Sequence, residues 1–431
     1  MAKLSVSLRR PCGHRALPRS LSPCSRFVSG RTQELMRKSQ GRFAVLQAGA
    51  RMHYAVPALL ARAGALAAFY TDLHASHRPL RLLNALWPEA SQPKPIKRLL
   101  GRQLPPDLPS ALVRDQPLAS LTWARRGSRG DALVLERACH EHFAGAKALY
   151  TNFINNDIDA VRQAKDQGLH VVHELIIGAD VGRILLEERR RYPGIEPEGE
   201  PEEVVEAGIT RDQQKWALSD QVLVPSNYCR QSSIALGCDP SKISLVPYGI
   251  PEHWFELVPD PQPGRILFVG QVGLRKGNHV LAEACRLLKR RGLSFECRVA
   301  GPAQVDVTHP LFQGPTYLGQ VPRSQIREEF RRADIFVLPT LADSFGLVHL
   351  EAMACGVPVI TTPHCGSVVR DGVDGFIVPI RDAGALADRL QQLLEGHGLR
   401  KQMGASARER ARDFTWARYG DRLLASLGVT P

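Results

Sequence analysis

An acidic residue inside an apolar helix is the first position at which this sequence suggests chemistry. Residues 347–355 have the composition of a short helix, and a helical wheel places Leu347, Leu350 and Ala354 on one apolar arc. Glu351 lies in the middle of that arc. A carboxylate in that position needs a partner, because burying an unpaired charge is costly. Two interpretations follow: a buried Glu paired with an Arg, or an acid that faces a cleft and binds a ligand hydroxyl or cation.

The turn before this helix has the features of an anion-binding site. A preceding run of Ile, Phe, Val and Leu predicts a strand, so the turn from Asp343 to Gly346 follows the carboxyl end of that strand. Ligands of open α/β sheets bind at this edge. Backbone N–H groups around Gly346 and Leu347, together with the positive end of the helix dipole, attract anions. Ser344 and Phe345 lie in the same turn, and the structural alternative is that Asp343 or Ser344 is an ordinary helix N-cap.

A glycine-rich basic turn is the second candidate site. It lies between a predicted strand and a predicted helix and has the sequence Gly270-Gln271-Val272-Gly273-Leu274-Arg275-Lys276-Gly277. Glycines such as Gly273 let the backbone approach a diphosphate, and Arg275 and Lys276 supply positive charge. The alternative is a solvated basic turn that binds no ligand.

The two motifs together resemble the retaining glycosyltransferases of family 4, which have the GT-B fold. The residues that carry the resemblance in the first motif are Asp343, Ser344-Phe345-Gly346-Leu347, Glu351-Ala352-Met353-Ala354, Gly356 and Pro358-Val359-Ile360. The family usually has Glu at both ends of its seven-residue spacer; here Glu351 matches the second Glu, whereas Asp343 replaces the first and is one methylene shorter. In the glycine turn Lys276 matches the family, but Gln271 stands where an Arg is common, and Arg275 is a candidate to replace that Arg.

The resemblance and the chain length imply an α/β protein of GT-B type, with two Rossmann-like parallel-sheet domains facing a cleft. At 431 residues the chain exceeds what one core usually organises. The similarity is good over residues 220–395 and weak before them. A first strand–turn–helix unit contains Gly49 in its turn, which is a predicted substrate-binding residue. The predicted parts are a basic extension (1–40), an N-terminal acceptor-side domain (41–255), a C-terminal nucleotide-sugar-binding domain (262–400) and C-terminal helices (401–431) that in the family cross back to the first domain.

Apolar periodicity and turn residues predict several further elements. Strands are expected at residues 42–47, 66–71, 148–152, 170–175, 265–269 and 294–300, and helices at 55–63, 280–290, 324–332, 384–394 and 399–424. Residues 193–203 are strongly acidic and are expected to form a solvated loop.

The net charge of +13 is concentrated near the N-terminus. Residues 1–40 contain nine Lys or Arg residues and one acidic residue, and they are rich in Ser and Pro. This composition is typical of a disordered arm or an organelle transit peptide, or of a start placed too early, and we favour disorder without a targeting role. Because most of the charge lies in a segment with no core to join, we predict no nucleic-acid partner.

Residues 78–130 form a second basic region. They combine Arg and Lys with Leu, Trp and Pro. One interpretation is solvated helices and loops that pack on the sheet; the other is a basic amphipathic surface that contacts anionic lipid or holds an acidic acceptor. No apolar run reaches the length of a transmembrane helix, so any membrane contact is expected to be peripheral.

Cysteine usage and the remaining acidic motifs predict no metal site. The nine cysteines are scattered and never form C-x-x-C, which argues against disulfides and zinc and for a reducing cytosol. Asp157 and Asp159 have the D-x-D form of other glycosyltransferases, but they lie at a predicted helix start, where acidic residues are common. His173 has no second His at the spacing of a zinc helix.

The predicted function is transfer of a sugar from a nucleoside-diphosphate sugar to a glycan, lipid or other acceptor, with retention of configuration and without a cofactor. Lys276, Arg275 and the helix terminus at Gly346 are expected to bind the diphosphate, because the leaving group is anionic. By the resemblance, Glu351 accepts from the ribose hydroxyls and Asp343 contacts the sugar. The expected setting is cell-surface polysaccharide biosynthesis in the cytoplasm.

Several alternatives remain open at this point. His173 is either the cleft histidine of the family or a structural residue. Other GT-B enzymes, such as an epimerase or a phosphorylase, share the same motifs. A non-catalytic nucleotide-sugar-binding or scaffold protein is a further alternative, favoured by the departures at Gln271 and Asp343.

Overall fold

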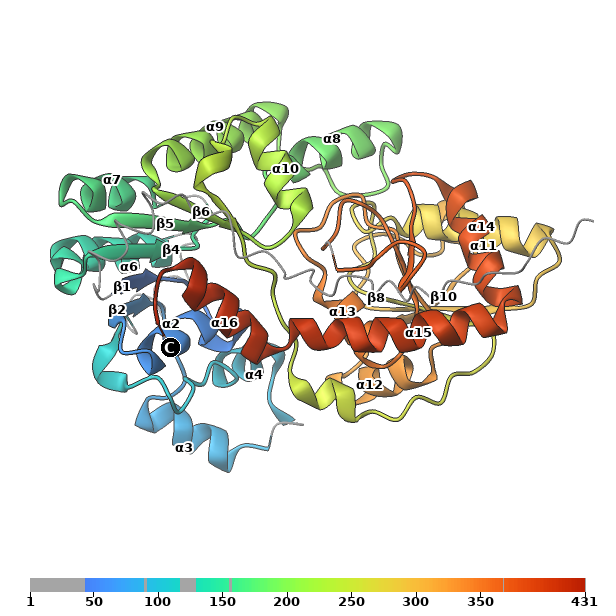
Figure 1. Cartoon of the computed structure of the whole chain (residues 1–431), viewed down its shortest axis with the longest axis horizontal. Helices are drawn as coiled ribbons and strands as arrows, with labels where there is room; N and C mark the ends of the chain where they lie inside the picture. Colours follow the sequence, from blue (N-terminus) through green and yellow to red (C-terminus); the bar gives the residue numbers. More distant parts are fainter. Residues whose placement is uncertain (1–42, 89–90, 117–128, 155–156, 367, 431) are drawn as a thin grey trace, which may run out of the picture.

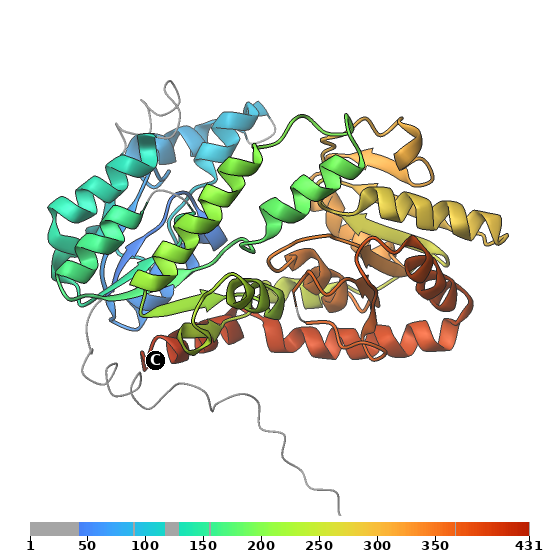
Figure 2. The same cartoon turned by 90° about the horizontal axis from the view of Figure 1, so that it is seen from above.

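The computed structural model describes residues 43–88, 91–116, 129–154, 157–366 and 368–430. The predicted basic extension, residues 1–40, lies outside the described residues. The described chain forms two lobes, each built on one parallel sheet with helices on its faces (Figures 1 and 2). The predicted α/β class with two Rossmann-like sheets is therefore confirmed.

The first lobe contains seven strands within the described residues, and all of their pairings are parallel. In spatial order they are β3 (Val113–Asp115), β2 (Leu66–Thr71), β1 (Phe43–Leu46), β4 (Ala148–Thr151), β5 (His170–Glu174), β6 (Gln221–Val224) and β7 (Ile243–Leu245). The direction of winding reverses between β1 and β4. Ligands of such sheets bind at this reversal, outside the carboxyl ends of the strands.

Helices connect these parallel strands, as crossover connections require. The helices of the first lobe are α2 (Ala55–Arg62), α3 (Arg78–Leu86), α4 (Lys94–Leu100), α6 (Arg129–His140), α7 (Ile158–Asp166), α8 (Val181–Arg191), α9 (Glu202–Leu218) and α10 (Asn227–Ala235). Most of them bury an apolar face against the sheet, for example Val56, Ala58 and Leu60 on α2. Helix α3 is different, because none of its residues is buried.

The second lobe repeats the same topology. Its six-stranded parallel sheet has the order β10 (Thr316–Gly319), β9 (Glu296–Ala300), β8 (Arg265–Val269), β11 (Ile335–Leu338), β12 (Val359–Thr361) and β13 (Gly375–Ile377) within the described residues. Its helices are α11 (Asn278–Arg290), α12 (Arg323–Arg332), α13 (Leu347–Ala354), α14 (Ala383–Glu395) and α15 (His397–Ala411). The winding reverses between β8 and β11, which are neighbours in the sheet.

The last predicted helix, residues 399–424, is two helices in the structure. Helix α15 ends at Ala411, and α16 (Trp416–Ser426) begins after an extended Thr415. The break has a structural cause: the Phe414 carbonyl accepts from Ile250 N at 2.8 Å, and Trp416 N donates back to the Ile250 carbonyl at 3.1 Å. This strand-like pairing requires extended backbone, so a continuous helix is excluded. Helix α16 then packs on α2 of the first lobe (Figure 1).

The hydrophobic core is shared between the lobes. One cluster of buried residues includes Tyr54 and Phe69 of the first lobe and Phe268 and Phe336 of the second. The seven cysteines among the described residues are free thiols. None of the helices in the described part of the chain combines the length and apolar character needed to cross a membrane.

Candidate functional site

The two sequence motifs meet at the winding reversal of the second sheet. The glycine turn, residues 270–277, follows β8, and the segment 339–346 follows β11, the neighbouring strand. Lys276 Nζ contacts the Asp343 carboxylate directly, and Arg275 donates to the Ala342 carbonyl at 3.1 Å. Two groups of residues that are far apart in the sequence therefore form one site at the carboxyl edge of the sheet.

Asp343 is an ion-paired carboxylate. Burial by itself would raise its pKa, but Lys276 and, more weakly, Arg275 at 4.0 Å hold the pKa of Asp343 below its ordinary value. The N-cap alternative is wrong: α13 follows Gly346, which has a left-handed backbone (φ 68°), and no side chain caps this helix. Asp343 thus binds a cation, and the same Lys276 is the predicted diphosphate ligand.

The turn before α13 also contacts the first lobe. Phe345 is buried, and its ring lies edge-on to that of Tyr248, with 5.3 Å between the centroids. The Ser344 carbonyl accepts from the Cys229 thiol at 3.6 Å. The backbone of the predicted anion site is therefore supported from the opposite lobe.

Helix α13 is buried on more than one side, which the helical wheel did not predict. Leu347 is only half-buried, while His349, outside the predicted arc, is fully buried. Burial lowers the pKa of His349 to about 4, so its ring is neutral at physiological pH. Glu351 is half-buried on this helix, and its proposed ribose contact stays a prediction.

The glycine turn already binds a carboxylate of the protein itself. Leu274 N donates to Glu196 Oε1 at 2.7 Å, and Gly273 N donates to Asn278 Oδ1 at 2.9 Å. A Cβ at Gly273 would lie 2.7 Å from Glu196 Oε1, so a larger residue here would force the Glu196 side chain to shift. Gln271 lies half-buried at the start of the turn.

Glu196 comes from the acidic segment 193–203 of the first lobe, which was predicted to be a solvated loop. That prediction is wrong for Glu196, whose side chain is only 5% exposed. Its second oxygen is 3.2 Å from Arg189 Nε at the end of α8. The glycine turn therefore binds an anion in this structure, which is the property expected of a diphosphate site.

On the first-lobe side, Glu174 rather than His173 connects to the second lobe. Glu174 is buried at the end of β5 and accepts from Tyr248 OH at 2.7 Å, and Arg51 NH2 lies 3.6 Å from it. Tyr248 in turn contacts Phe345. Sequence reasoning missed Glu174, although its place at the carboxyl end of a predicted strand was a usable signal.

His173 faces the opposite side of the sheet, because successive residues of a strand alternate. It is 3% exposed and lines a cavity of about 180 Å³ whose lining residues all belong to the first lobe. Burial, with a smaller effect of Lys215, lowers its pKa well below the ordinary value. The structure does not bring His173 together with Lys276 and Asp343.

Gly49, a predicted substrate-binding residue, and Asp157, from the D-x-D sequence that was discounted as a metal site, both have structural partners. Gly49 has φ 68° and donates its N–H to Asp72 Oδ1 at 2.8 Å. Asp157 is fully buried and lies 3.0 Å from Lys215 Nζ, whereas Asp159 is exposed. The two acidic residues of the D-x-D sequence therefore point to different environments.

Comparison with known protein families identifies the type of domain that forms the second lobe. Residues 250–410 match the family model of glycosyl transferases group 1, so the chain contains a domain of this type. One relative is an amylovoran biosynthesis glycosyltransferase of Erwinia amylovora, 29% identical over 57% of this chain and 60% of that protein. A D-inositol 3-phosphate glycosyltransferase of Paenarthrobacter aurescens is 26% identical over 65% of this chain and 72% of that protein. The match to the Erwinia protein thus leaves two fifths of its length uncovered.

Solved structures identify the fold. Anabaena Alr3699/HepE in complex with UDP and glucose has a TM-score of 0.58 at 14% identity, covering 90% of this chain and 100% of that chain. Sucrose-phosphate synthase of Thermosynechococcus elongatus has a TM-score of 0.54 at 19% identity, covering 85% and 90%. At these identities the likeness concerns the fold, and it agrees with the predicted GT-B arrangement.

Proposed function

We propose that this protein is a glycosyltransferase that moves a sugar from a nucleoside-diphosphate sugar to an acceptor with retention of configuration, as in family 4. The observation that carries the proposal is the meeting of the glycine turn with Asp343 at the winding reversal of the second sheet. The group 1 domain match over residues 250–410 supports the same class. Retention rests on the family 4 pattern of Asp343 and Glu351.

The chemistry requires stabilisation of an anionic leaving group. Lys276, Arg275 and the N–H of Leu274 can supply it, because fixed cations and N–H dipoles act strongly where charge develops. Lys276 would then divide its contacts between the diphosphate and Asp343. In this proposal Asp343 orients the sugar and Glu351 binds the ribose hydroxyls.

The acceptor is proposed to bind at the carboxyl edge of the first sheet. Gly49, Arg51 and Glu174 lie at this edge, and Glu174 is connected through Tyr248 to the turn before α13. A relative is named for amylovoran biosynthesis, which favours a glycan or lipid-linked acceptor of cell-surface polysaccharide synthesis.

We further propose that helix α3 contacts an anionic membrane surface in the cytoplasm. Leu82 and Leu86 are 63% and 82% exposed, and Arg78 and Arg81 are exposed on the same helix, which has no acidic residue. Exposed leucines beside cations are typical of helices that lie in a lipid interface. The double variant Leu82→Ser with Leu86→Ser should lose co-sedimentation with vesicles rich in phosphatidylglycerol. Equal sedimentation of both proteins would exclude this surface.

The decisive test combines binding with turnover. Thermal-shift and calorimetric titrations with a panel of nucleotides and nucleotide sugars, beginning with UDP and UDP-glucose, should identify a donor. A sensitive assay should then detect the released nucleoside diphosphate, and NMR of the product should show the anomeric configuration of the donor retained.

The controls separate the alternatives. Lys276→Met should abolish donor binding while the protein stays folded. Binding without nucleotide release, with every acceptor tried, would favour a non-catalytic binding protein. Release of a free epimerised sugar or of a sugar phosphate would favour an epimerase or a phosphorylase.

A further inference from the structure

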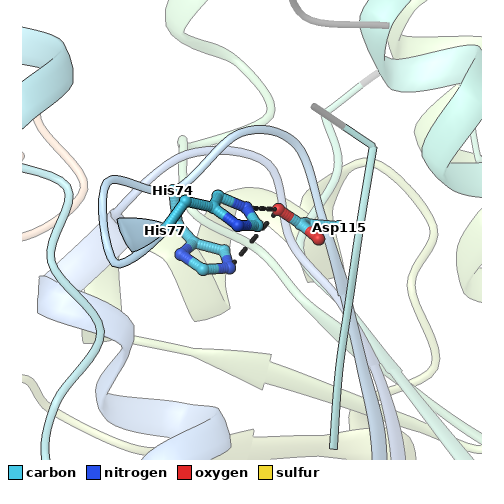
Figure 3. A group of neighbouring side chains, drawn as sticks. All are labelled: His74, His77 and Asp115. Atoms are coloured by element: carbon cyan, nitrogen blue, oxygen red, sulfur yellow. Dashed lines mark hydrogen bonds and ion pairs between the residues drawn. The ribbon is translucent and has the colours of Figure 1, made fainter. Parts of the chain in front are cut away.

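Two histidines and an aspartate converge at the carboxyl ends of β2 and β3, outside the proposed donor site, and none of the three is among the residues assigned to the acceptor. His74 and His77 lie in the turn after β2, and Asp115 is the last residue of β3. Figure 3 shows both rings pointing at the Asp115 carboxylate. His74 Nε2 is 3.3 Å from Asp115 Oδ2, and His77 Nε2 contacts the same oxygen.

The cluster of His74, His77 and Asp115 is negatively charged when both rings are neutral, which favours binding of a cation. The Asp115 carboxylate contacts the two imidazoles, and Arg137 donates to the main-chain carbonyl of Asp115 instead, at 2.6 Å. The neighbouring Asp72 is already paired with Arg102 at 2.6 Å. With neutral rings, the cluster carries one negative charge and no lysine or arginine contacts its carboxylate in the described structure.

The turn that carries the histidines is held in place by backbone contacts. Ala75 N donates to the Arg102 carbonyl at 2.8 Å, and Leu104 N donates to Ser76 Oγ at 2.8 Å. Holding potential ligands in place before binding is a requirement for a tight metal site.

We propose that His74, His77 and Asp115 bind one divalent transition-metal ion, with Zn²⁺ as the best match. Zinc bonds to imidazole nitrogen and carboxylate oxygen are about 2.0 to 2.2 Å long, so two tetrahedral ligand atoms lie about 3.3 Å apart. The distance from His74 Nε2 to Asp115 Oδ2 has this value, and all three ligand atoms lie within 4.8 Å of one another. His77 Nε2 is in direct contact with the same oxygen, so its ring must move back to admit the ion. Three protein ligands leave a coordination position for water or for an oxygen of a ligand.

Metal binding and the existing hydrogen bonds compete for the same atoms. His74 Nδ1 accepts from Ser76 N at 3.2 Å, which places the proton of the neutral ring on Nε2, where it points to Asp115. A bound metal replaces that proton, so the ring proton moves to Nδ1 and the Ser76 bond is lost. This change of tautomer distinguishes a metal site from a purely hydrogen-bonded cluster.

The test uses the full chain, freed of any affinity tag and stripped of metal with a chelator. Zn²⁺ is titrated in competition with a chromogenic chelator against the wild type, His77→Ala, Asp115→Asn and, as a matched control, His397→Ala, which removes an exposed imidazole elsewhere. We expect one site per chain, an affinity lower by about tenfold or more in the first two variants, and no change in the control. Circular dichroism confirms that each variant is folded, which we expect for His77→Ala because His77 is 38% exposed.

Two spectroscopic measurements complete the test. Co²⁺ in place of Zn²⁺ should give ligand-field bands without a thiolate charge-transfer band, and the ¹⁵N shifts of the His74 ring should change from the Nε2–H to the Nδ1–H tautomer. Equal Zn²⁺ affinity in all four proteins, a thiolate band, or an unchanged His74 tautomer would overturn the proposal. The proposal does not depend on the glycosyltransferase activity.

Discussion

Glu196 contacts the glycine turn, and we predict that removing its carboxylate increases the affinity for the donor. Most mutations in a binding site decrease affinity. The Glu196 carboxylate accepts from Leu274 N at 2.7 Å, within the turn that is proposed to bind the donor diphosphate. A diphosphate that uses this N–H must first displace the carboxylate. Removing the carboxylate should therefore tighten donor binding rather than weaken it.

The magnitude follows from the hydrogen bond that is displaced. A hydrogen bond to a charged group contributes about 1.5–3 kcal/mol, against roughly 0.5–1.5 kcal/mol for a neutral one. Glu196→Ala removes the competitor and should raise donor affinity by roughly 10- to 100-fold, at about 1.4 kcal/mol per factor of ten. Glu196→Gln keeps a neutral acceptor and should give a gain of about 5- to 10-fold. Arg189, which loses its anionic partner in both variants, adds attraction for the diphosphate.

The assay is calorimetry with the nucleoside diphosphate identified by the screen above, at constant ionic strength. Glu198→Gln is the matched control, because it removes the same charge from an exposed position in the same segment. We expect the affinity for the nucleoside diphosphate to be highest in Glu196→Ala, lower in Glu196→Gln, and lowest in the wild type and the Glu198→Gln control. Weaker binding in both Glu196 variants would show that Glu196 supports the site instead of competing for it, and equal binding in all four would place the diphosphate elsewhere.

Three further predictions concern the proposed donor site. Glu351→Ala should weaken nucleotide-sugar binding in the folded protein, because the proposed contact with the ribose hydroxyls is lost; unchanged affinity in the folded fraction would refute this contact. Asp343→Glu should change the ranking of donor sugars by kcat/KM more than it changes nucleotide affinity, because an unpaired polar group in a closed site costs about 1–3 kcal/mol. If kcat/KM changed by the same factor for every donor, a contact between Asp343 and the sugar would be refuted. Nucleotide binding should persist in EDTA, because Lys276 and Arg275 supply the positive charge; loss of binding with rescue by Mn²⁺ would refute this.

Local sequence was sufficient to predict the elements around the donor site. The strands at residues 66–71 and 265–269 have the predicted bounds, as β2 and β8. The strand, turn and helix that contain Asp343 and Glu351 were also predicted, because periodicity and turn residues act over a few positions. The same reasoning failed at residues 399–424, where pairing with Ile250 interrupts a sequence that has helical periodicity.

Contacts between distant segments could not be predicted in this way. The side of the sheet that a residue faces depends on the register and the strand order, so the sequence singled out His173 while its neighbour Glu174 joins the contact between the lobes. The approach of Glu196 to Leu274 depends on how the two lobes are placed, which no local pattern encodes.

The sequence by itself therefore determined the class of fold and the residue types that can bind a diphosphate, because strands, turns and glycines are specified by neighbouring residues. The tertiary structure decided which of these groups meet. Parallel strands bring together turns that are tens of residues apart, and so Lys276 reaches Asp343, and His74 and His77 reach Asp115, only when the sheets have formed.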